Sequence, residues 1–98
     1  MRNVIWSEES EDDYNENIDY LLRKWTDKEA QRFIDNVNKI ESQLKEDNVE
    51  FVKADYKGIH TVPIDKHVKL IYRKKTKTEV ELLRFWNTAK DPNNLKLQ

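Results

Sequence analysis

The sequence contains no cysteine, only one glycine and only two prolines. Without cysteine the chain can form no disulfide, no zinc–thiolate site and no thiol nucleophile, which fits a reducing compartment. No segment approaches the roughly 20 apolar residues of a membrane span, and the first residues lack the apolar run of a signal peptide. We therefore expect a soluble cytoplasmic protein that does not bind a membrane.

The 98 residues predict a single domain, residues 1–98, with one modest core. Charged residues make up 38% of the chain, yet three Trp, four Tyr and three Phe argue against disorder. Residues 1–51 carry 14 acidic and 7 basic side chains, whereas residues 52–98 carry 5 acidic and 11 basic ones. This division indicates either a basic surface for an anionic partner or simply acidic helices beside less acidic strands.

The N-terminal half reads as a strand followed by two helices. Residues 3–6 favour a strand, and Ser7 before a run of acids is typical of a helix N-cap. Thr26 and Glu29 form a capping box that predicts a second helix after a linker of one or two residues. So short a linker places the two helices side by side as an antiparallel hairpin.

The second half reads as three strands, at residues 59–64, 67–74 and 79–86. Their close spacing favours antiparallel neighbours. We therefore predict an α+β fold in which an N-terminal strand joins a small antiparallel sheet and the helical hairpin packs on one face of that sheet.

The predicted strands carry apolar residues on both faces. In the 67–74 strand, simple alternation places Ile71 on the face of His67, Lys69 and Arg73. One helical hairpin covers only one face of a sheet. The tail, a second copy or a partner should therefore cover the other face. The apolar residues expected there are Ile71, Leu83 and Phe85.

Four segments in this order resemble the RelE/ParE superfamily, the toxin half of bacterial type II toxin–antitoxin pairs. They are VIWSEESEDDYNENIDYLLRKW (4–25), DKEAQRFIDNVNKIESQL (27–44), HVKLIYRKK (67–75) and EVELLRFWNTAKDP (79–92). The resemblance implies a growth-inhibiting toxin, often linked to plasmid stabilisation, that a cognate antitoxin neutralises in a hetero-oligomer. ParE-like members act on DNA gyrase by binding, and RelE-like members cleave mRNA on the ribosome.

If the chain is a ribosome-dependent endoribonuclease, its candidate catalytic residues are His67, Lys69, Arg73 and Arg84, since cleavage needs proton carriers and cationic clamps. Family members often carry His and Arg after the last strand, where this chain has Asn87, Ala89 and Lys90. The C-terminal tail NNLKLQ contains no tyrosine or histidine, the ring side chains that could carry a proton during cleavage. These departures favour the ParE-like branch, and an inactive member that only binds its partner is the other alternative.

For a ParE-like role the candidate target-binding residues are Lys69, Arg73, Arg84, Asn87 and Lys90. The antitoxin implied by the resemblance could cover the apolar face of Ile71, Leu83 and Phe85, which the helices leave uncovered. Two histidines without cysteine predict no metal site, and we expect no cofactor. A homodimer is a further possibility. The sequence shows Arg84 as a lone arginine at a strand end. Arg84→Ala should therefore abolish toxicity and leave the fold intact.

Overall fold

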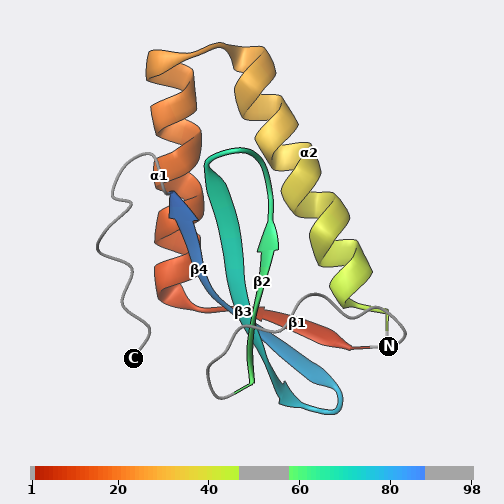
Figure 1. Cartoon of the computed structure of the whole chain (residues 1–98). Coiled ribbons are helices and arrows are strands. Elements are labelled where there is room, and N and C mark those ends of the chain that lie inside the picture. The colour runs from red at the N-terminus through yellow and green to blue at the C-terminus, as the bar shows by residue number, and fades with distance from the viewer. Residues whose placement is uncertain (1, 47–57, 88–98) are drawn as a thin grey trace.

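The computed structural model describes residues 2–46 and 58–87. The elements follow one another as β1 (Asn3–Trp6), α1 (Glu8–Lys24), α2 (Asp27–Leu44), β2 (Ile59–Pro63), β3 (Val68–Thr76) and β4 (Glu79–Asn87). Figure 1 shows α1 and α2 as a hairpin beside a twisted sheet, with the α1–α2 connection at one end and the β3–β4 turn at the other. The α+β fold predicted from the sequence is confirmed. None of the described helices is long and apolar enough to cross a membrane.

Both helices begin where their capping residues predict. The backbone N–H of Ser10 donates to the Ser7 hydroxyl over 3.1 Å, and the N–H of Glu29 donates to the Thr26 hydroxyl over 3.2 Å. Each bond satisfies an amide that has no partner within its own helix. The acids of the first turn of α1 add favourable charge at the positive end of the helix dipole.

The sheet has the order β1-β4-β3-β2 and is mixed. β2, β3 and β4 are antiparallel as predicted, but β1 pairs with β4 in parallel, from Asn3 opposite Glu79 to Trp6 opposite Leu82. The prediction of a wholly antiparallel sheet is therefore wrong at one edge. The parallel arrangement leads the chain from the end of β1 directly into α1, which contacts the rest of β4.

A β-bulge at Leu83 changes which residues of β4 face the helices. Tyr72 pairs with Leu82 while the preceding Ile71 pairs with Arg84, so Leu83 has no partner on β3. One extra residue reverses the alternation of side chains beyond it. Leu82 faces the helices before the bulge and Phe85 faces them after it, as the core cluster shows.

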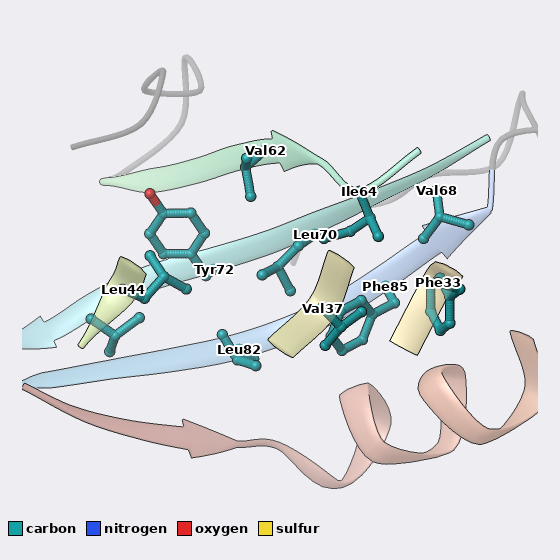
Figure 2. Close-up of a cluster of buried hydrophobic side chains, with 11 residues drawn as sticks. Phe33, Val37, Leu44, Val62, Ile64, Val68, Leu70, Tyr72, Leu82 and Phe85 are labelled. Carbon is teal, nitrogen blue, oxygen red and sulfur yellow. The ribbon is translucent and has the colours of Figure 1, made fainter. Parts of the chain in front are cut away.

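The core lies between the helices and this face of the sheet. Figure 2 shows Phe33 and Val37 of α2 pointing toward Leu70 of β3 and Phe85 of β4. The prediction that Phe85 lies on the uncovered face is therefore wrong. It rested on simple alternation along the strand, which does not account for the bulge. The buried hydrophobic members of the core cluster are Phe33, Val37, Leu44, Val62, Ile64, Val68, Leu70, Tyr72, Val80, Leu82 and Phe85.

The phenol of Tyr14 should make the stability of this fold sensitive to alkaline pH. Burial, and then the nearby Glu41 carboxylate, raise the pKa of Tyr14 above its ordinary value of 10.0. As pH rises, the unfolded chain loses this proton first, so the free energy of unfolding should fall once pH passes about 10. Tyr14→Phe should make that fall shallower in urea titrations between neutral pH and pH 10.5. A pH profile of Tyr14→Phe that matches that of the unaltered chain would contradict the assignment.

Candidate functional site

β4 extends past the end of β1, and the N-terminal part of α1 forms hydrogen bonds with this section of the β4 edge. The N–H of Ser7 donates to the carbonyl of Leu82 over 3.1 Å, and the Ser7 hydroxyl donates to the carbonyl of Leu83 over 3.0 Å. Farther along, the N–H of Phe85 donates to Oδ2 of Asp13 over 3.1 Å. These bonds replace the ladder that β1 would otherwise continue, and they hold α1 against the end of β4.

Asp13 also binds the side chain of Arg84. Nε of Arg84 donates to Oδ2 over 2.6 Å and Nη2 donates to Oδ1 over 3.0 Å, a bidentate pair across 71 positions of sequence. The Arg84 guanidinium carbon also lies 5.5 Å from the centre of the Trp86 ring. The hydrogen bond with Asp13 raises the pKa of Arg84, against a smaller opposing effect of burial. Arg84 is therefore not the lone arginine that the sequence suggested.

A cleft of about 310 Å³ lies between α1 and the end of β4. The Asn87 amide donates to Oδ1 of Asn17 over 3.0 Å, and Asn17 donates to the carbonyl of Asp13 over 2.9 Å. The cleft offers amide groups, one arginine paired with a carboxylate, and aromatic rings, which suit it to binding. Its lining residues are Asp13, Glu16, Asn17, Tyr20, Arg84, Phe85, Trp86 and Asn87.

Three predicted cations share the face of the sheet that points away from the core, here called the outer face. Lys69 stands opposite Trp86, Ile71 opposite Arg84, and Arg73 opposite Glu81. The bulge at Leu83 is what brings Arg84 onto this face. Arg73 is held by Glu81, with both Nε and Nη2 lying 2.7 Å from Oε1. Two of the three cations are thus already paired with carboxylates.

His67 does not join them. It precedes β3 in the β2–β3 connection, where its N–H donates to Oδ1 of Asp65 over 2.8 Å. It lines a second cleft of about 440 Å³ on the core side of the sheet, together with Trp25 and Phe33. The expectation that His67 shares a face with Lys69 is therefore wrong, because the chain has not yet entered β3 at this residue.

The residues predicted to bind an antitoxin are largely buried. Ile71 is 0% exposed and Phe85 is 2% exposed, so neither side chain is available to a partner in this conformation. Phe85 lies under the helices, and the chain itself covers Ile71 on the outer face. Leu83 is half-buried at the bulge. Lys90 lies outside the described residues.

Two exposed apolar residues near the α1–α2 connection were not among the predicted site residues. Leu22 is 48% exposed and Trp25 is 60% exposed, although each follows an apolar residue of α1, Ile18 or Leu21, by four positions, the spacing of one helix face. Trp25 is the C-cap residue and has left the helical conformation, so its side chain does not follow the spacing. Leu22 succeeds Leu21 directly, and residues 100° apart on a helix are not both central to one face. The adjacency of Leu21 and Leu22 in the sequence could therefore have indicated that one of them is exposed.

Comparisons with known proteins agree with this geometry. A family model described as the ParE toxin of the type II toxin–antitoxin system parDE matches residues 4–92. The fold is similar to a chain of the chromosomal ParDE system from P. aeruginosa, with a TM-score of 0.71 and 16% identity over 89% of this chain and 96% of that one. No match is found among curated protein sequences.

Two further solved structures share the fold. A chain of the E. coli DinJ–YafQ complex gives a TM-score of 0.62 at 13% identity, over 93% of this chain and 98% of that one. A chain of the YoeB–YefM complex from S. aureus gives 0.58 at 13% identity, over 88% and 95%. At such identities the likeness is one of fold, whereas the family match spans nearly the whole sequence.

Proposed function

Since this chain belongs to the ParE toxin family of type II toxin–antitoxin systems, we propose that it inhibits DNA gyrase by binding and that a cognate antitoxin neutralises it in the cytoplasm. The proposal assigns it no cleavage chemistry of its own. The structures with a similar fold include toxin–antitoxin complexes, which supports an antitoxin as the partner.

The pairing of the outer-face arginines carries the choice of binding over cleavage. A nuclease needs cations that are available to a phosphate and a proton carrier beside them. Here Arg73 is paired with Glu81, Arg84 is paired with Asp13, and His67 lies on the other side of the sheet. Such an arrangement favours a rigid recognition surface.

We assign target binding to the end of β4 and its neighbour on β3. Lys69 lies opposite Trp86, and Arg84 lies over the same ring, so one aromatic side chain is flanked by two cations. Asn87 continues the surface into the cleft beside α1. Aromatic and arginine side chains of this kind contribute strongly to protein–protein binding.

We assign antitoxin binding to the apolar cleft at the α1–α2 connection in place of the outer face. Leu22 and Trp25 are the large hydrophobic side chains most exposed in the described part of the chain. Trp25 lines a cleft that is also lined by Lys66, Asp65 and Arg32, and Arg32 pairs with Glu29 over 3.5 Å. An amphipathic antitoxin segment would cover these apolar side chains, and an acid on its flank could pair with Lys66.

A ribosome-dependent endoribonuclease is the second candidate. The observation in its favour is that Lys69, Arg73 and Arg84 occupy neighbouring register positions on one face. A row of cations at that spacing can contact a nucleic-acid backbone if the carboxylates are displaced.

The test is a supercoiling assay with the protein purified away from its antitoxin. We expect inhibition of gyrase, and Lys69→Ala should weaken it about tenfold, as loss of one well-placed interface side chain does. Lys39→Ala, an exposed lysine on α2, is the matched control and should act like the unaltered protein. Cleavage of mRNA in a translating extract, with supercoiling unaffected, would establish the second candidate instead. If cells that express this chain without its antitoxin keep growing, the chain is an inactive member of the family.

A further inference from the structure

The basic turn that joins β3 to β4 is separate from the surfaces assigned above. The β3–β4 tip, defined here as residues 74–78, lies at the start of β4, while the candidate target surface lies at its end (Figure 1). We propose that this tip binds the phosphodiester backbone of a nucleic acid. The inference does not depend on which target the toxin inhibits.

A built cleft lies at the tip. It has a volume of about 400 Å³ and is lined by Arg2, Lys74, Thr76 and Lys77. Arg2 is only 7% exposed and already has an interaction partner, so it forms part of the wall of the cleft, whereas Lys74 and Lys77 are exposed to solvent. Cationic and hydroxyl side chains are among the donors that proteins use to contact phosphate oxygens.

Backbone bonds hold the parts of this cleft in place. The N–H of Arg2 donates to the carbonyl of Lys45 over 2.9 Å, which joins the start of β1 to the end of α2. The N–H of Asn3 donates to the carbonyl of Thr78 over 2.7 Å, which joins the same segment to the tip. The two segments that line the cleft, at Arg2 and at the tip, are thus held together by the backbone before any ligand arrives.

The tip is basic: residues 74–78 hold three lysines and no acid. The nearest acid along the chain, Glu79, accepts from the Thr76 hydroxyl over 3.4 Å. The helices carry the opposite charge, with 11 acidic and 5 basic side chains in α1 and α2 together. In the described part of the chain this separation places opposite charges on the helices and on the tip, which would turn the tip toward a polyanion. The described cations in the cleft or on the tip are Arg2, Lys74, Lys75 and Lys77.

The chemistry of the tip favours a nucleic acid over a membrane surface. Every residue from Arg73 to Thr78 is exposed and none is apolar, so the tip has nothing to insert among lipid chains. A two-stranded β-ribbon is also narrow enough to enter the major groove of B-form DNA, or to lie along a single strand. Phosphodiester contact requires no base recognition, so we expect weak selectivity for sequence.

Fluorescence anisotropy with the full chain tests the proposal. The probes are a labelled 20-base-pair DNA duplex and a labelled 20-nucleotide RNA strand, each titrated at several salt concentrations. The variant combines Lys74→Gln, Lys75→Gln and Lys77→Gln, all at exposed positions. We expect it to bind about tenfold more weakly and to lower the salt slope by about 3. The relative affinity for the two probes identifies the source of the phosphodiester.

The matched control combines Lys24→Gln, Lys28→Gln and Lys39→Gln, exposed lysines of the helices whose removal changes net charge equally. It should bind within about twofold of the unaltered chain. Arginine at the three tip positions should keep full binding. Equal losses in the tip and control variants would overturn the proposal, as would absence of binding to both probes. Stronger binding to phosphatidylserine vesicles than to either nucleic acid would overturn it as well.

Discussion

Replacing Phe85 by alanine should lower the free energy of unfolding by about 3–5 kcal/mol, a large part of what a domain of this size has. Phe85 is 2% exposed, and its ring centre lies 5.3 Å from that of Trp6, 5.8 Å from that of Tyr14 and 6.3 Å from that of Phe33. Alanine would leave a cavity among rings fixed by two helices and a strand. Urea unfolding followed by tryptophan fluorescence measures the loss.

Leu83→Ala is the matched control, because it removes an apolar side chain two positions away on the same strand. Leu83 is half-buried at the bulge, so its loss should cost about 1 kcal/mol. Without the bulge, simple alternation would put Leu83 and Phe85 on the same uncovered face, and both variants should then lose little stability but bind a partner less well. Equal free energies of unfolding for the two variants would therefore contradict the switch of faces at the bulge.

Asp13→Ala should be the second most damaging change, at about 2–4 kcal/mol. The carboxylate accepts from Nε and Nη2 of Arg84 and from the N–H of Phe85, and its side chain is only 12% exposed. Alanine would strip the strand amide of its partner and leave the guanidinium unpaired beside Trp86. The end of β4 should then separate from α1, which thermal unfolding and amide exchange at Phe85 would both report.

Asp12→Ala, at the neighbouring exposed position, controls for the loss of one helix-start acid and should cost less than about 0.5 kcal/mol. Arg84→Ala should cost about 1 kcal/mol, since its side chain is 40% exposed and the bond from Phe85 to Asp13 survives. That variant should stay folded, and we still expect it to lose toxicity. A cost for Arg84→Ala as large as that for Asp13→Ala would show that the ion pair, and not the strand amide, dominates.

Local chemistry accounts for what could be predicted. Ser7 and the Thr26–Glu29 box marked both helix starts, because a cap and the amide that it binds lie within three residues. The strands were found because alternation and turns are also short-range signals. The outer-face position of Lys69 and Arg73 followed from the same alternation within one strand.

Other features depend on residues far apart in the chain. The bulge arises from the pairing of β3 with β4, and nothing in the sequence around Leu83 indicates it. Only the tertiary structure therefore shows on which face of the sheet Phe85 and Arg84 lie. The pair between Asp13 and Arg84 joins positions 71 residues apart. It forms because parallel pairing of β1 leaves part of the β4 edge to α1. The sequence by itself determined the elements, their order and the family resemblance; register and long-range hydrogen bonding decided which side chains meet.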